Sequence, residues 1–146
     1  MNDSKKAIDF YKKAFAAKET FAPMMHEGKV MHARVVIGDS ELMLTDEMWI
    51  SKSPLTLGDS PVVLYLKVDD VDSVFKRAVE AGAKVVMPPA DMFWGDRYSR
   101  VTDPFGHHWG IGTTIKNLSR EEMEKGKEKA MAEMSKSKDE CAVKPA

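Results

Sequence analysis

The sequence predicts an α+β fold built from two similar halves. Apolar residues recur at helical spacing in two short segments, 4–15 and 71–81, and segments of strand length with alternating apolar residues follow each of them. The predicted order is a helix and three strands, a loop, and then a strand, a helix and three strands. Because a helix would cover the apolar face of the strands in each half, this order favours an α+β fold with an internal repeat.

The bulk composition is that of a soluble domain, or of two small modules that share a core. The chain has 146 residues, a formal charge of −1 and 43% hydrophobic residues. A charge near zero offers no attraction to nucleic acid, and no apolar run approaches the ~20 residues of a membrane span. The N-terminus is polar, so no signal peptide is expected, and the single cysteine, Cys141, allows no disulfide within the chain. We therefore expect a cytoplasmic protein with no nucleic-acid or membrane partner.

The first half begins with a helix. Polar residues at 2–4 are candidate N-caps, and apolar side chains then follow on one helix face as far as Phe15. Strands are expected over 19–25, 30–37 and 41–46. Alternation along the central strand gives one apolar face, made of Met31, Ala33, Val35 and Ile37. The opposite face of that strand carries Val30, His32, Arg34 and Val36.

The segment 47–60 separates the halves and is expected to be a linker or an active-site loop, because it contains Pro54 and Gly58. Two interpretations of the apolar group Met48, Trp49 and Ile50 are open. It forms a lid over a site, or it anchors the loop to the core.

The second half begins with an apolar strand over 62–68 and a helix that ends at Gly82. A strand over 84–87 is expected to stop at Pro88 and Pro89. The stretch 93–111 predicts two strands joined by a tight turn at Asp103-Pro104-Phe105-Gly106, which has favourable turn residues. A weak helix over 119–134 and a disordered tail over 136–146 complete the prediction.

Several segments in this order carry a resemblance to a known family. They are Ala7–Phe15, Val30–Ala33 with Ile37–Ser40, Val68–Asp72, Trp94–Arg97 and Asp103–Trp109. Over about residues 3–115 the chain resembles the vicinal oxygen chelate superfamily, which includes glyoxalase I, bleomycin resistance proteins and extradiol dioxygenases. Among these it is most similar to the PhnB-like glyoxalase-related branch.

The resemblance implies a fold of paired βαβββ modules, from which the first strand of module 1 is missing here. Module 1 would span about 3–46, the loop 47–60 and module 2 about 61–115, all within a domain of residues 1–118. Residues 119–146 would then form a C-terminal helix and a flexible tail. Three explanations of the missing strand are open: a truncated chain, a gap filled by the tail, or exchange of elements in a dimer.

The resemblance also implies a metal held by four ligands, one of them on the missing strand. The other three positions fall on Met43, Val63 and Gly110, and none of these residues can bind a hard or borderline cation. We therefore expect no cofactor and none of the superfamily's metal chemistry. The alternative is a divalent metal such as Zn or Ni at a relocated site that uses His32 and His108.

Polar and aromatic side chains opposite the apolar strand faces either meet water or line a pocket. The resemblance turns Tyr98, Arg100 and His108 inward. We therefore expect a ligand to contact His32, Arg34, Tyr65, Trp94, Tyr98, Arg100 and His108. Arg100 is the best candidate to bind an anion, whereas Trp94 either stacks on the ligand or plugs the rim. No catalytic residue is assigned.

The expected function is the binding of a small molecule by a homodimer, without the superfamily metal. The alternative is a lyase or isomerase that resembles glyoxalase, with or without a metal. A third possibility is a copy of the fold without a ligand.

Overall fold

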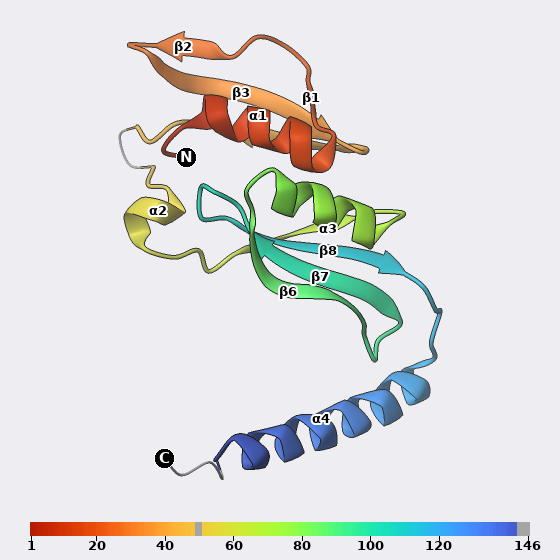
Figure 1. The fold of residues 1–146 in the computed structure, drawn as a ribbon. Helices are drawn as coiled ribbons and strands as arrows, with labels where there is room; N and C mark the ends of the chain where they lie inside the picture. The colour runs from red at the N-terminus through yellow and green to blue at the C-terminus, as the bar shows by residue number, and fades with distance from the viewer. Residues whose placement is uncertain (49–50, 143–146) are drawn as a thin grey trace.

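The computed structural model describes residues 1–48 and 51–142, which form two four-stranded sheets and four helices. The α+β class predicted from the sequence is confirmed. In Figure 1 the helices α1 and α3 lie together between β3 of the first sheet and β8 of the second.

The first unit consists of α1 and four strands, with β3 at the centre of the sheet. Asp3 caps α1, because its carboxylate accepts a 3.0 Å hydrogen bond from the Lys6 amide. Strands β1, β2 and β4 all pair antiparallel with β3, and no strand precedes α1 among the residues described. The element bounds are α1 Ser4–Phe15, β1 Lys18–Glu19, β2 Met24–His26, β3 Lys29–Ile37 and β4 Ser40–Leu44.

The second unit is a complete βαβββ module with strand order β5-β8-β7-β6. β5 pairs parallel with β8, and the remaining pairs are antiparallel. Asp70 caps α3 through a 3.1 Å bond from the Ser73 amide. The bounds are α2 Pro54–Leu57, β5 Val63–Lys67, α3 Val71–Glu80, β6 Lys84–Asp91, β7 Asp96–Thr102, β8 His108–Thr114 and α4 Arg120–Ala142.

A single core joins the two units through α1. The rings of Tyr11 and Phe15 lie 5.3 Å and 4.6 Å from that of Trp109 on β8, and Ala33 and Val35 of β3 are fully buried on the other side of α1. Each sheet therefore turns one face toward the two helices and the other face away from them (Figure 1). The inward faces are covered by α1 and α3, so a site formed by strand residues has to lie on the outward faces.

The structure corrects three local predictions. β6 continues through Pro88 and Pro89 to Asp91, because it is the edge of its sheet and its register shifts around the prolines, so no pairing N–H is required there. In β3 the buried side chain is Val30, whereas Met31 is 41% exposed, the reverse of the predicted alternation. The C-terminal helix continues past 134 to Ala142.

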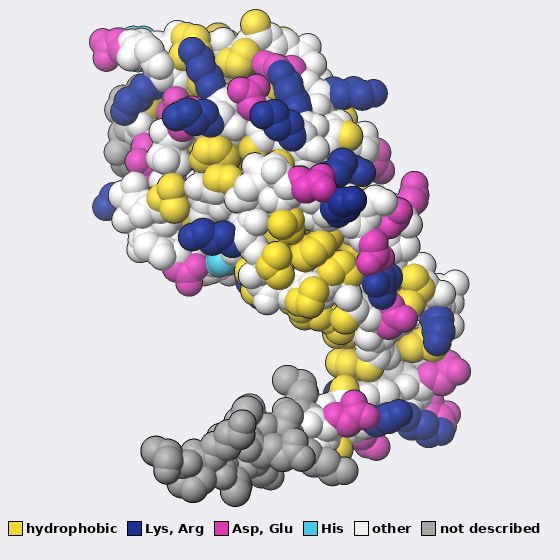
Figure 2. All heavy atoms as spheres, viewed as in Figure 1, with side chains coloured by type: hydrophobic (Ala, Val, Ile, Leu, Met, Phe, Trp, Pro, Cys, Tyr) yellow, Lys and Arg dark blue, Asp and Glu magenta, His cyan; other side chains and the backbone are white. Residues whose placement is uncertain are grey.

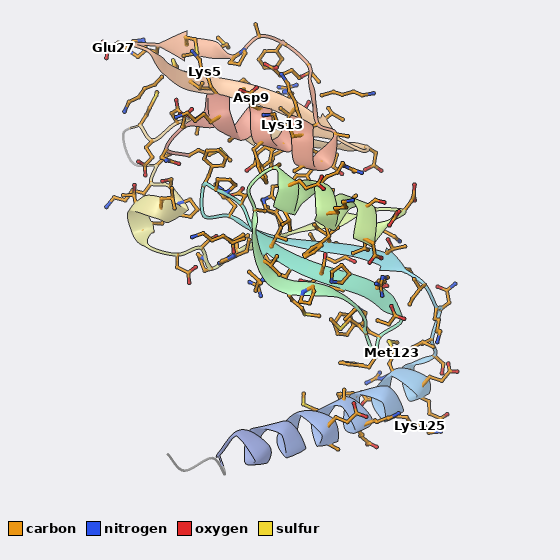
Figure 3. All side chains as sticks on the ribbon, viewed as in Figure 1. Lys5, Asp9, Lys13, Glu27, Met123 and Lys125 are labelled. Atoms are coloured by element: carbon orange, nitrogen blue, oxygen red, sulfur yellow. The ribbon has the colours of Figure 1, made fainter. Side chains whose placement is uncertain are left out.

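Helix α4 runs away from the two sheets, and its first turns lie beside the β6–β7 connection, where Met123 points (Figures 1 and 3). The predicted lid group falls partly on residues 49–50, and the end of the predicted tail on 143–146; both lie outside the described residues. No helix in the described part of the chain is both long and apolar enough to cross a membrane.

Candidate functional site

Two tyrosine rings lie flat across the outer face of the second sheet. Tyr65 on β5 and Tyr98 on β7 flank the central strand β8, and their rings are 6.3 Å apart with planes only 7° from parallel. β8 carries glycine where the rings cross it. A Cβ at Gly110 would lie 2.6 Å from Tyr98 Oη, and a Cβ at Gly112 would lie 2.1 Å from Tyr65 Oη. The two glycines therefore give the rings room to rest on the strand.

Trp94, two residues before the start of β7, extends this aromatic surface. Its ring meets that of Tyr98 edge to face at 6.0 Å, and its indole N–H donates to Asp96 at 3.1 Å. Trp94 is 37% exposed, and Tyr65 is 55% exposed. Partial burial, together with the nearby Asp96 carboxylate, raises the pKa of Tyr65, so this phenol stays neutral and presents an uncharged ring to solvent. Figure 2 shows hydrophobic side chains gathered over the second sheet.

Arg100 and His108 provide the polar part of the same face. Arg100 Nε is buried and, within the residues described, has no hydrogen-bond acceptor. His108 Nδ1 lies 2.9 Å from Thr102 Oγ1, and Nε2 lies 3.0 Å from a carboxylate oxygen of Asp59. The hydrogen bond to His108 lowers the pKa of Asp59. Both ring nitrogens of His108 are therefore occupied, whereas Arg100 retains an unused donor.

His32 and Arg34 lie on the outer face of the first sheet. The His32 ring stacks on Phe21 at 5.5 Å, and the Arg34 guanidinium lies 5.3 Å from the centre of the same ring. Arg34 Nε is 3.2 Å from Glu41 Oε1, an ion pair whose angles fall short of a hydrogen bond. We call the outer face of the second sheet, which carries Tyr65 and Tyr98, the tyrosine face. Helices α1 and α3 lie between it and this second cluster (Figure 1).

The structure thus divides the seven predicted contact residues into two groups. The second-sheet group contains Tyr65, Trp94, Tyr98, Arg100 and His108. The first-sheet group contains His32 and Arg34, and within one chain the two groups face away from each other. The relocated metal site that would use His32 and His108 together is not assembled within one chain.

The sequence did not predict Asp59 or Phe21 as site residues, nor the part that Gly110 and Gly112 play beside the two tyrosine rings. Asp59 and Phe21 lie in segments without a strong pattern, and only the fold brings them to His108 and to Arg34. The glycine pair had a visible signal, because Gly-x-Gly inside a strand indicates close approach of another group.

The residues that the resemblance places at the superfamily's metal positions do not fit a site for a hard or borderline cation. Met43 is 60% exposed, Val63 is apolar, and the space beside Gly110 is filled by the Tyr98 ring. Among the residues described, no three His, Cys, Asp or Glu side chains are close enough together to hold an ion. We therefore derive no reaction step that passes through this metal.

Comparison with known proteins supports the assignment of the fold. Residues 1–111 match the family model of the Glyoxalase/Bleomycin resistance protein/Dioxygenase superfamily. The Mycobacterium bovis protein Mb0911c is 42% identical over 129 residues, which cover 85% of each chain.

Two solved structures are also similar. TioX from Micromonospora sp. ML1 superposes with a TM-score of 0.61 at 25% identity, covering 82% of this chain and 94% of TioX. The Arabidopsis thaliana gene product At5g48480 gives a TM-score of 0.60 at 29% identity, covering 73% and 85% of the two chains. From its two modules, its strand order and these matches, we conclude that the chain belongs to the glyoxalase/bleomycin resistance protein/dioxygenase superfamily.

Proposed function

We propose that this protein binds a small planar molecule with a negatively charged group, on the tyrosine face of the second sheet. The observation that carries the proposal is the pair of nearly parallel rings, Tyr65 and Tyr98, beside the unused guanidinium N–H of Arg100. Flat aromatic surfaces favour stacking with another ring, and a guanidinium favours a carboxylate or a similar planar anion.

The unpaired Arg100 guanidinium gives this face its preference for an anion. A buried donor without an acceptor costs about 1–3 kcal/mol, and more when the group is charged. Arg97 on the same strand is fully engaged, with Asp72 at 2.6 Å and Asp91 at 2.8 Å. Arg100 makes no salt bridge within the residues described, whereas Arg97 makes two, so a ligand anion would be drawn to Arg100.

A second copy of the chain would complete the site. The tyrosine face is open in one chain, with Val63 39% and Tyr65 55% exposed. In a homodimer, the first-sheet face of one protomer could cover the second-sheet face of the other. His32 and Arg34 of that protomer would then join the five residues of the second sheet. This arrangement explains why the predicted contact residues occur on two separated faces.

A lyase or isomerase is less favoured by the geometry. On the tyrosine face, His108 has both ring nitrogens engaged by Thr102 and Asp59, so neither is free to accept a proton from a substrate. We also propose that the protein belongs to the PhnB-like branch and lies in the cytoplasm. The location rests on a single cysteine that can form no disulfide within the chain.

The proposal is tested with 1-naphthoate as the probe, by fluorescence titration and thermal shift. We expect Arg100→Gln to weaken binding about tenfold, equivalent to 1.4 kcal/mol, and Tyr65→Leu to weaken it as well. Arg97→Gln is the matched control and should leave the affinity unchanged. An uncharged analogue, 1-naphthalenemethanol, should bind less well than the acid.

Two results would overturn the proposal: no planar acid in a panel stabilises the protein, or Arg100→Gln and Arg97→Gln behave alike. Light scattering at the titration concentrations tests the second copy. A monomer that binds the probe with full affinity would refute the shared site but not the tyrosine face.

A further inference from the structure

Methionines gather near His32 on the outer face of the first sheet, where Met43 of β4 lies directly across from Arg34 of β3. A cavity of about 290 Å³ there has Met31, His32, Met43 and Met48 among its lining residues. The remaining lining residues are Leu44, Thr45 and Ser51, and no carboxylate contributes to the wall. The cavity thus brings three methionines and one histidine, residues with thioether and imidazole donors, to a single wall.

A β-bulge brings Met31 into this group. Strict alternation would turn Met31 toward the core, but Met25 of β2 pairs with Val30 and Met24 pairs with His32, which leaves Met31 without a partner in β2. Val30 and Ala33 are both fully buried, so the two residues between them, Met31 and His32, share the outer face. Bulges commonly re-aim a side chain next to a functional site.

The other two methionines reach the cavity from separate segments. Met43 lies on β4 and is 60% exposed, and Met48 lies in the connection that follows β4. Their side chains add little to the core, and methionine is a flexible residue that adapts to irregular sites. Packing in the first unit therefore does not account for three methionines beside one histidine around this cavity.

The charged groups near the cavity do not oppose a cation. Arg34, which pairs across the strands with Met43, is held by Glu41 at 3.2 Å and lies over Phe21. Lys29 Nζ donates to the Glu47 carbonyl at 3.0 Å, at the far side of Met48. The Phe21 ring also stacks on His32, which fixes the plane of the imidazole.

Thioether and imidazole ligands together select soft ions, whereas hard cations require oxygen ligands and zinc sites normally include thiolate, several imidazoles or carboxylate. We propose that this cavity binds one soft monovalent metal ion, Cu(I), through Met31, Met43, Met48 and His32. All four ligands come from the first unit, and only Met43 occupies one of the positions that the resemblance assigns to the superfamily's metal.

The test is an anaerobic titration with Cu(I) in competition with bicinchoninate. All proteins carry Cys141→Ser, because a thiol is itself a soft ligand. We expect one equivalent to bind. Met31→Leu and Met43→Leu should each weaken binding about tenfold or more. Mutation of a residue that only supports a metal ligand already lowers metal affinity by about this factor. Leucine conserves the volume of methionine, so these variants should fold.

Met131→Leu is the matched control, because Met131 is as exposed as Met43 but lies on α4. It should leave the affinity unchanged. Titration with Ag(I), followed by NMR of the methionine methyl groups, should shift the signals of Met31, Met43 and Met48 selectively. Absence of a stoichiometric Cu(I) site, equal weakening by Met43→Leu and Met131→Leu, or Ag(I) shifts confined to other methionines would each refute the proposal.

Discussion

Replacing Asp103 with alanine is expected to destabilise the protein by about 3–5 kcal/mol, because this buried carboxylate ties helix α1 to the turn before β8. Asp103 is 3% exposed. One oxygen accepts hydrogen bonds from Tyr11 Oη at 2.8 Å and from Trp109 Nε1 at 3.0 Å. The other accepts from the amides of Phe105 and His107, both at 2.9 Å.

The magnitude follows from the donors that the substitution leaves unpaired. Tyr11 and Trp109 are 0% and 3% exposed, so their O–H and N–H would find no water without a rearrangement of the core. Each such donor costs about 1–2 kcal/mol, and the two turn amides add a smaller amount because the turn is nearer the surface. Asp103→Asn keeps an acceptor for the amides and should cost about half as much.

The same carboxylate makes stability depend on pH. Burial raises the pKa of Asp103, but the hydrogen bonds from His107, Trp109 and Tyr11 outweigh this effect and hold the pKa below its usual value. A group whose pKa is lower in the folded state stabilises that state above its unfolded pKa. The contribution of Asp103 should therefore be complete above about pH 4 and be lost as the pH falls through the folded pKa.

Urea denaturation of the wild type and Asp103→Asn, repeated between neutral pH and pH 3, measures both effects. The difference in free energy of unfolding should be largest at neutral pH and should shrink in acid. Asp91→Asn is the control, because the exposed Asp91 carboxylate bonds only to Arg97 among the described residues; it should barely move the midpoint. A loss below about 1 kcal/mol for Asp103→Ala, or a difference independent of pH, would refute the reasoning.

Three further outcomes follow from single contacts. Gly112→Ala should displace the Tyr65 ring, whose Oη would lie 2.1 Å from the new Cβ, and lower the affinity for 1-naphthoate about tenfold in fluorescence titration. Asp3→Ala should cost about 1 kcal/mol in chemical denaturation, because it removes the N-cap of α1. Breaking the exposed pair of Arg97 with Asp72 by Asp72→Asn should change the thermal midpoint little, and raising the salt concentration should reduce even that change.

Alternation and turn chemistry predicted most of the fold, because the second unit follows both closely. Trp109 and Ile111 are buried, while Tyr98 and Arg100 lie on the opposite, outward face of their sheet. Asp103 indeed begins a turn, and its side chain bonds the amides that follow. Local pattern is sufficient where each strand has one covered face and regular pairing.

The failures occur where pairing is irregular or where the contact is distant in sequence. Pro88 was expected to end a strand, but an edge strand with shifted register needs no N–H from it. Met31 was expected in the core, but because of the bulge in β3 Val30 is buried and Met31 is exposed. The pairing of His108 with Asp59 joins residues 49 positions apart across the loop, and no local signal identifies it.

The lack of a metal-binding side chain at position 110 and the presence of the tyrosine face are two aspects of one structural feature. The resemblance implies a superfamily ligand at position 110, and any side chain there begins with a Cβ that would lie 2.6 Å from Tyr98 Oη. A ligand at 110 and the Tyr98 ring in its present position therefore exclude each other. Gly110→Glu alone would displace the ring without restoring a site, because Met43 and Val63 still provide no hard donor. The second sheet can hold either a metal or an aromatic surface, and its glycines are compatible only with the latter.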